Sequence, residues 1–242
     1  MKFDELKKLH QKKYREQFGH YLIEGEHLVL ELIKAAEMRA DLRTSTIYIS
    51  EDHAPIESSL ALQVLSSKQM AELTETDSPQ GIVALVPIVP TTAAVDGRTR
   101  ETTICLYEIQ DPGNLGTILR SLAWFGGFHC LLTTNSVDLY NGKVLRASLG
   151  AHWHVPIETD VDIGSLPDRF AKIARLDMQG KSTRDASFRD FDCYLFGNEA
   201  RGLPRSVVEG MPTTPFTITG LRTIESLNLA AAVNVCAYEL RR

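Results

Sequence analysis

The 242-residue chain lacks the signatures of several large protein classes. Its four cysteines are widely spaced and form no C-x-x-C pair, so the sequence indicates neither a disulfide framework nor a zinc site. No apolar run approaches the roughly 20 residues that a membrane-spanning helix needs. The first residues also lack the apolar core of a signal peptide. We therefore expect a cytoplasmic protein with buried, reduced thiols.

Several catalytic motifs are missing as well. The sequence has no G-x-S-x-G, no G-x-x-x-x-G-K-[ST], no G-x-G-x-x-G and no H-E-x-x-H. His152 and His154 would share one face of a strand, but two histidines are too few for a closed zinc site, which takes four ligands. A buried or surface histidine pair is the simpler interpretation, and we predict no metal site.

Charge gives a mixed signal about nucleic acid. The formal net charge is −5, which does not favour a polyanionic partner, but local patches decide such binding. One basic run lies within the first fifteen residues. Its basic side chains are Lys2, Lys7, Lys8, Lys12, Lys13 and Arg15. Taken alone, such a run is more typical of a solvated helix face than of a binding site.

Residues 1–88 have the pattern of a small α/β unit. A strand at 20–24 passes through Gly25 into an amphipathic helix with apolar residues at 28, 29, 32 and 33. The composition and spacing predict further strands at 45–49, 61–65 and 81–86 and a short helix at 67–74. Residues 87–100 hold two prolines, a glycine and three threonines without a sustained period. This composition is typical of a linker, which we place at 89–101.

Residues 102–242 again alternate between strands and helices. The predicted strands are 103–107, 130–133, 155–157, 194–196 and 215–218. The predicted helices are 114–126, 143–149, 167–174, a short one after Leu203-Pro204, and 226–242. This alternation predicts a mostly parallel sheet with helices on both faces. Ligands of such sheets bind at the carboxyl ends of the strands.

Three segments place glycine or asparagine next to a predicted strand end or helix start: 111–120, 196–203 and 225–229. Exposed backbone N–H groups at such positions can meet a polar ligand. Each segment alone is also explained without a ligand. The glycines at 197 and 202 fit a tight loop, and Ser226 fits a helix N-cap.

The helix predicted at 114–126 separates one charged residue from its apolar face. Leu115, Ile118, Leu119 and Leu122 form a single stripe at helical spacing, and Arg120 falls off it. Arg120 is thus free to meet solvent or a ligand. The final helix is apolar almost all round, which indicates burial within the domain or between subunits.

Together, the three segments resemble the three motifs of the SpoU (TrmH-like) RNA ribose 2′-O-methyltransferases of the SPOUT superfamily. Asn114–Arg120 is similar to the first motif and Phe196–Leu203 to the second. Ile218 with Glu225–Ala230 is similar to the third. Residues 1–88, with Tyr21–Gly25, resemble the family's ribosomal-protein-like substrate-binding domain.

The resemblance implies a fold and a set of partners. It implies a C-terminal SPOUT domain with a deep trefoil knot, a homodimer with active sites at its interface, and S-adenosylmethionine as cofactor. The residues that match the family's cofactor-binding positions are Leu195, Gly197, Asn198, Ile218, Leu227 and Asn228. Those that match its catalytic positions are Asn114, Arg120, Glu199 and Asn228.

The expected reaction is methyl transfer to a ribose 2′-hydroxyl of structured RNA, either rRNA or tRNA. Arginine is a poor general base because its pKa exceeds about 12, so we expect Arg120 to act as an electrostatic clamp. Two alternatives stay open: a catalytically inactive RNA-binding or ribosome assembly factor, and an RNA base methyltransferase. The candidate RNA contacts are Lys7, Lys8, Lys12, Lys13 and Arg15.

Overall fold

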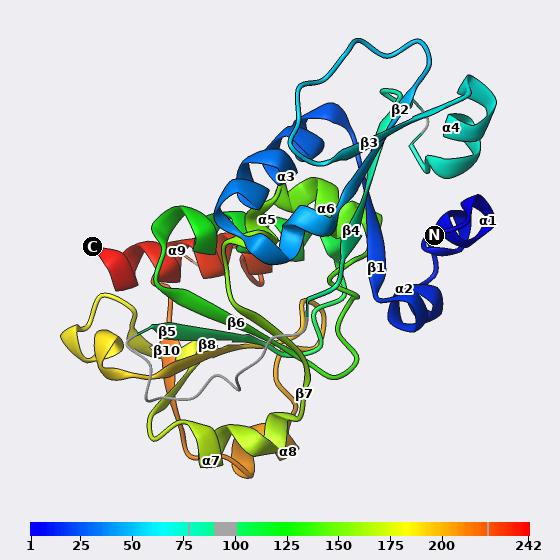
Figure 1. Cartoon of the computed structure of the whole chain (residues 1–242). Coiled ribbons are helices and arrows are strands. Elements are labelled where there is room, and N and C mark those ends of the chain that lie inside the picture. The colour runs from blue at the N-terminus through cyan, green and yellow to red at the C-terminus, as the bar shows by residue number, and fades with distance from the viewer. Residues whose placement is uncertain (77, 90–100, 222) are drawn as a thin grey trace. The chain divides into compact units, whose positions relative to one another are not determined.

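The computed structural model describes residues 1–76, 78–89, 101–221 and 223–242 (Figure 1). The chain divides into two compact units. The first comprises Met1–Pro90 with Asp138–Trp153, and the second comprises Thr91–Val137 with His154–Arg242. The linker expected at 89–101 falls almost entirely outside the described residues and stays a prediction.

The first unit contains a four-stranded sheet in the order β1-β4-β2-β3. Strand β4 runs antiparallel to β1 and β2, whereas β2 and β3 are parallel. All four strands that the sequence predicted are confirmed. Their bounds are β1 His20–Glu24, β2 Thr46–Ser50, β3 Ala61–Leu65 and β4 Ile82–Pro87.

Helix α3 (Glu26–Met38) supplies one side of the core of this unit. It starts after Gly25, whose φ of 103° is a conformation that favours glycine. Its apolar stripe, from Leu28 to Ala36, is buried. The other helices of this unit are α1 Phe3–Lys8, α2 Lys12–Phe18, α4 Ser67–Leu73, α6 Gly142–Ser148 and the 3₁₀ turns Ala40–Thr44 and Ala151–Trp153.

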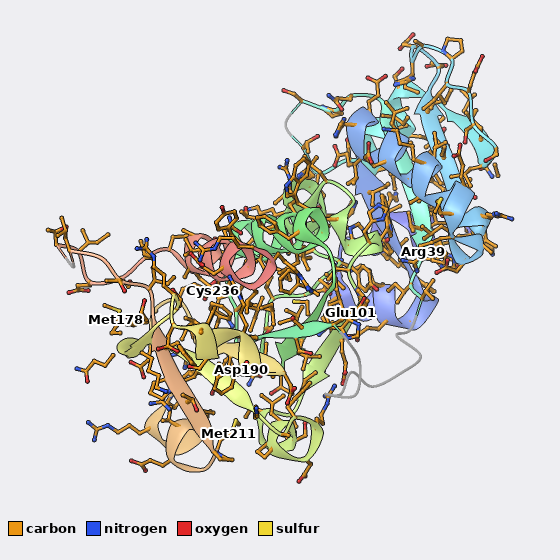
Figure 2. The ribbon with its side chains drawn as sticks, turned by 90° about the vertical axis from the view of Figure 1, so that its left-hand side faces the viewer. Arg39, Glu101, Met178, Asp190, Met211 and Cys236 are labelled. Atoms are coloured by element: carbon orange, nitrogen blue, oxygen red, sulfur yellow. The ribbon has the colours of Figure 1, made fainter. Side chains whose placement is uncertain are left out.

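Residues 138–153 pack with the first unit although they lie between two strands of the second. The Trp153 indole donates a hydrogen bond to the Tyr21 hydroxyl at 2.8 Å, and His152 Nε2 lies 3.1 Å from the same oxygen. Arg39, labelled in Figure 2, donates to the Trp153 carbonyl at 2.8 Å. Burial of this network raises the pKa of Tyr21.

The second unit is built on a six-stranded parallel sheet in the order β10-β8-β9-β5-β6-β7. Helices α5 and α9 lie on one face, and α7 and α8 on the other (Figure 1), which confirms the predicted architecture. The strands are β5 Thr102–Leu106, β6 Phe128–Thr133, β7 Ile157–Val161, β8 Ile173–Ser182, β9 Cys193–Phe196 and β10 Thr213–Thr217. The helices are α5 Pro112–Phe125, α7 Leu166–Arg169, α8 Arg205–Glu209 and α9 Leu229–Arg241, with 3₁₀ turns at Ile163–Ser165 and Ala186–Asp190.

Three sequence-based boundaries of the second unit are wrong: those of the helix at 167–174, the strand at 155–157 and the final helix. The helix predicted at 167–174 ends at Arg169, because Ile173 and Ala174 are buried in β8. The strand predicted at 155–157 begins only at Ile157. It follows a 3₁₀ turn that buries His152 and exposes His154, so the two histidines do not share a strand face.

The final helix starts three residues later than predicted. Its N-cap is Asn228, whose side-chain oxygen accepts from Ala231 N at 3.2 Å, and not Ser226. Asparagine and serine are about equally good caps, so composition alone does not decide between them.

The four cysteines are free and buried, as the sequence predicted. Burial raises the pKa of Cys105 to about 12, and Cys236 lies on α9 (Figure 2). No helix within the described ranges is long and apolar enough to cross a membrane. The trefoil knot that the resemblance implies stays a prediction.

Candidate functional site

The three segments follow β5, β9 and β10 in the second unit. Strands β5 and β9 are parallel neighbours in which Leu106 lies opposite Phe196. The first two segments therefore leave the sheet side by side at the same edge. The third segment leaves β10 and leads into α9.

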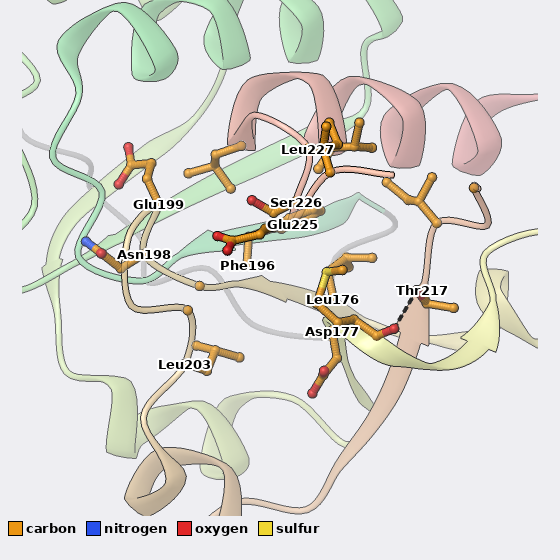
Figure 3. Close-up of a pocket in the computed structure, with 18 of the residues that line it drawn as sticks. Leu176, Asp177, Phe196, Asn198, Glu199, Leu203, Thr217, Glu225, Ser226 and Leu227 are labelled. Carbon is orange, nitrogen blue, oxygen red and sulfur yellow. Dashed lines mark hydrogen bonds between the residues drawn. The ribbon is translucent and has the colours of Figure 1, made fainter. Parts of the chain in front are cut away.

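The second and third segments enclose a cavity of about 730 Å³. In Figure 3, Asn198 and Glu199 come from the loop after β9, and Glu225, Ser226 and Leu227 from the segment before α9. The predicted cofactor positions that line the cavity are Gly197, Asn198, Ile218 and Leu227. Leu195 does not line it, because its side chain is buried in the core beside Cys105 and Cys193.

A third wall comes from β8, a strand that the sequence did not predict. Pro215 of β10 lies opposite Arg175, whereas Phe216 lies opposite Lys181, so residues 176–180 form an irregular excursion. This excursion brings Leu176, Asp177 and Met178 to the cavity. The Thr217 hydroxyl donates to the Met178 carbonyl at 3.3 Å (Figure 3).

Gly180 is the residue that allows this excursion. Its φ is 155°, and an added Cβ would lie 2.5 Å from the Pro215 carbonyl oxygen. Glycine is required there both by backbone conformation and by the close approach of β10. Gly180 is also the sequence signal that points to this wall, although a lone glycine does not say where it leads.

The loop after β9 is held by the buried side chain of Asn198. Its Nδ2 donates to the Glu108 carbonyl at 2.7 Å, and its Oδ1 accepts from the backbone of Ala200 and Arg201 at 3.0 and 3.1 Å. Gly197 closes the same loop, since an added Cβ would lie 2.5 Å from the carbonyl carbon of Gly202. The shape of the cavity wall thus depends on close backbone contacts.

Glu108 links the ends of three strands. Its N–H donates to Thr133 Oγ1 at 2.8 Å, and its carboxylate pairs with Arg201 at 2.6 Å. Its φ of 46° lies in the left-handed region that few residues other than glycine adopt. Such backbone strain persists only where the surrounding contacts fix it, and it is often found at functional sites.

Three of the four predicted catalytic residues form one hydrogen-bonded chain. The amide of Asn228 donates to Asn114 Oδ1 at 2.9 Å, and Asn114 Nδ2 donates to Glu199 at 3.3 Å. The Glu199 carboxylate also accepts from the N–H groups of Gln110 and Asp111, at 3.3 and 3.2 Å. The chain ties the starts of α5 and α9 to the loop after β9. Asn228 itself does not line the cavity.

Arg120, the fourth predicted catalytic residue, is exposed on α5. Leu115, Ile118, Leu119 and Leu122 are buried on the opposite stripe, as the helical spacing predicted. Within the described part of the chain, no group forms a hydrogen bond or ion pair with the Arg120 guanidinium. The guanidinium is therefore available to a partner.

The predicted RNA contacts lie in the first unit and differ in their surroundings. Lys7 pairs with Glu72 and Asp4 at 3.1 and 3.2 Å. Arg15 departs from the expectation: it is buried, donates to the Leu9 carbonyl at 2.7 Å and pairs with Asp138. A buried, paired guanidinium is not available to RNA. In the described ranges, no three His, Cys, Asp or Glu side chains gather to hold a metal ion.

Comparison with known proteins identifies the family. Residues 101–238 match the SpoU rRNA Methylase family, and residues 2–84 match the MRM3-like substrate binding domain. The chain belongs to the SpoU rRNA Methylase family. It is 29% identical over 246 residues to the 23S rRNA (guanosine(2553)-2′-O)-methyltransferase RlmP of Bacillus subtilis, covering 99% of this chain and 96% of RlmP.

Solved structures agree with this assignment. A putative RNA methyltransferase of the TrmH family from Porphyromonas gingivalis is 26% identical, with a TM-score of 0.80 over 99% of this chain and 96% of that one. The SpoU methyltransferase AviRb from Streptomyces viridochromogenes, in complex with the cofactor AdoMet, shares the fold with a TM-score of 0.82 at 19% identity, over 99% and 96% of the two chains.

Two glycines of the cavity wall should respond differently to alanine. Gly197→Ala places a methyl against the backbone of Gly202 and should lower the free energy of unfolding by about 1–3 kcal/mol. Gly220 also lines the cavity, but a Cβ there has open space around it, so Gly220→Ala should leave stability nearly unchanged. Urea denaturation measures both. Equal stabilities of the two variants would contradict the steric account of the loop.

Proposed function

We propose that this member of the SpoU rRNA Methylase family transfers a methyl group from S-adenosylmethionine to a ribose 2′-hydroxyl of rRNA. The observation that carries the proposal is the match to RlmP, named as a 23S rRNA 2′-O-methyltransferase, along 99% of this chain. The match spans both the substrate-binding unit and the unit that holds the cavity. Transfer RNA is the alternative substrate, because a relative from Synechocystis that is 32% identical over 98% of this chain carries the name tRNA/rRNA methyltransferase.

The cavity suits a ligand of the size of S-adenosylmethionine. Its volume of about 730 Å³ lies within the range of small-molecule sites. Leu203, Ile218 and Leu227 offer apolar surface for an aromatic base, and the loop around Gly197 brings the backbone close enough to contact the ligand. When bound there, S-adenosylmethionine supplies an electrophilic methyl group on its sulfonium.

The nucleophile is a ribose hydroxyl, which reacts slowly unless its oxygen gains negative charge. A guanidinium is a poor general base, so we assign Arg120 to stabilise this charge and not to remove the proton. We assign the guanidinium to the phosphate next to the reacting ribose and to the developing oxyanion. The proton leaves through that phosphate or through water.

Asn114 orients the sugar, and Glu199 and Asn228 fix Asn114. The carboxylate of Glu199 only accepts hydrogen bonds, so the Nδ2 of Asn114 must face it. The Asn114 oxygen then faces the amide of Asn228. Among the described residues, each of the two amides donates one N–H to a protein partner, which leaves the other N–H for a ligand. Glu199 and Asn228 thus position the group that meets the sugar.

Arg120→Ala should lower the rate of methyl transfer by about 10²–10³, because it removes charge stabilisation from the transition state. Binding of S-adenosylmethionine, measured by calorimetry, should stay unchanged, since Arg120 does not line the cavity. Arg184→Ala, at another exposed arginine of the same unit, is the matched control and should retain full activity.

The product identifies the reaction. A 2′-O-methylated ribose resists alkaline cleavage of the RNA at that site, so nucleoside analysis after alkaline digestion distinguishes it from a methylated base. A base-methylated product would replace the ribose assignment. Absence of S-adenosylmethionine binding at millimolar concentration would favour the inactive assembly factor instead.

Glu199→Gln tests the positioning of Asn114. Glutamine keeps the shape but replaces one acceptor oxygen with a donor, so kcat should fall by about 10- to 100-fold, the equivalent of one charged hydrogen bond. The pH dependence of kcat should keep its wild-type form. If the variant instead loses an acidic limb of the wild-type profile, Glu199 is a general base and the positioning role is wrong.

A homodimer is the assembly that the surface of the second unit favours. Trp124 on α5 is 86% exposed, and Tyr238 and Val235 on α9 are 53% and 38% exposed. The rings of Phe125 and Tyr238 meet edge to face at 6.2 Å, so the two helices form one surface. Clustered apolar side chains of this size mark interaction sites. We assign this surface to a second copy of the chain, and expect the dimer in the cytoplasm.

Trp124→Lys should convert the dimer to a monomer, because a charge replaces the most exposed aromatic ring of this surface. Sedimentation velocity at micromolar concentration measures the change. Met38→Lys, on α3 of the first unit, removes a side chain that is 88% exposed and should leave the dimer intact. A wild-type chain that sediments as a monomer would contradict the assignment.

A further inference from the structure

The basic run at the N-terminus separates into paired and unpaired cations. Lys7 contacts Glu72 and Asp4, and Lys12 lies 3.6 Å from Glu16. Lys8 and Lys13 are exposed, and neither ammonium forms an ion pair within the described part of the chain. These two lysines therefore keep their charge available to a polyanion.

The ammonium groups of Lys8 and Lys13 lie over one aromatic ring. Lys13 Nζ is 4.6 Å and Lys8 Nζ is 5.6 Å from the centre of the Tyr14 ring. Contacts of this kind are weak at an exposed site and break easily, because each lysine has a flexible four-carbon stem. Tyr14 is half-buried, so part of its ring is within reach of an incoming group.

The ring of Tyr14 is held in place by its neighbours on α2. Phe18, one helical turn later, stacks on it with an interplanar angle of 13° and a centroid distance of 6.1 Å. Phe18 in turn packs against the buried cluster that contains Leu6 and Leu9. The helix then ends at Gly19, whose φ is 64°. Tyr14 is thus an anchored, partly exposed platform.

A fixed aromatic ring flanked by unpaired cations is suited to single-stranded RNA. Proteins bind unpaired bases by stacking them on aromatic side chains while lysines contact the phosphates. A duplex offers its phosphate backbone but no unpaired base to stack on the ring. An acidic peptide would pair with the ammonium groups but would not need the ring. The combination of ring and cations therefore favours an unpaired nucleotide over either of these partners.

We propose that Tyr14, Lys8 and Lys13 form a binding site for an unpaired base and its adjoining phosphates in the substrate RNA. The proposal rests on the proposed function only in that the substrate is RNA. The base stacks on Tyr14 after one lysine moves aside, and the two ammonium groups then contact phosphate oxygens.

The test measures binding of the full-length protein to a fluorescent single-stranded RNA and to a duplex of the same sequence, over a range of salt. Tyr14→Leu should weaken single-strand binding by about 5- to 100-fold, the range measured for loss of one base stack, and should leave the salt slope unchanged. Tyr14→Phe should retain wild-type affinity. Duplex binding should change little in either variant.

The lysines provide a matched comparison. Lys8→Gln and Lys13→Gln, made singly and together, should reduce the magnitude of the salt slope by about 0.7 for each phosphate that the variant no longer binds. Lys7→Gln should change the slope less, because the Lys7 ammonium already has carboxylate partners. Circular dichroism and calorimetry with S-adenosylmethionine check that each variant folds.

Three outcomes overturn the site: equal single-strand affinity of Tyr14→Leu and wild type, an equal loss for the duplex, or a salt slope that changes as much for Lys7→Gln as for a single substitution of Lys8 or Lys13. A further assay adds an acidic peptide as a competitor of the RNA. If the peptide displaces RNA equally from wild type and Tyr14→Leu, and the variant has lost no RNA affinity, the site binds a protein partner. If Tyr14-dependent RNA binding persists but the wild type makes no 2′-O-methylated product, the proposed function fails and the RNA site stands.

Discussion

The Glu199 carboxylate and its hydrogen bonds are the contacts on which the rest of the candidate site depends. Through them the loop after β9 is tied to the start of α5 and, by way of Asn114, to the N-cap of α9. These segments lie far apart in the sequence. Because β5 and β9 are parallel neighbours in register, their carboxyl ends bring the first two segments within hydrogen-bond distance. The wall of the cavity and the proposed sugar-binding amide are therefore parts of one network.

Close backbone contacts shape the cavity as much as side chains do. Gly197 and Gly180 each lie where a Cβ would meet main-chain atoms at 2.5 Å. The buried amide of Asn198 holds the loop after β9, because its oxygen accepts from the loop backbone and its nitrogen donates to the Glu108 carbonyl beyond the end of β5. A cofactor bound mainly by backbone groups needs such fixed geometry, because main-chain N–H groups cannot adjust to a ligand as flexible side chains do.

Burial distinguishes the basic residues of the N-terminal run that stabilise the fold from those that a ligand can reach. Arg15 and Lys13 look alike in sequence, as basic residues of the same run. In the fold, Arg15 turns inward, donates to the Leu9 carbonyl and pairs with Asp138, whereas Lys13 stays exposed over Tyr14. Asp138 belongs to residues 138–153, which join the first unit from the middle of the second. No local pattern could have predicted that pairing.

The sequence by itself determined the features that depend on neighbouring residues. The strands other than β8, the long helices α3, α5 and α9, the apolar stripe of α5 and the exposure of Arg120 all follow from spacing and composition. The tertiary structure alone decided the excursion of β8, the helical cap at Asn228, the packing of residues 138–153 and the orientation of the Asn114 amide. Each of these depends on contacts between segments far apart in the chain, and periodicity reports only the local preference of a segment. The missed strand at Ile173 has the same cause, since its burial in the sheet outweighed the local helical pattern.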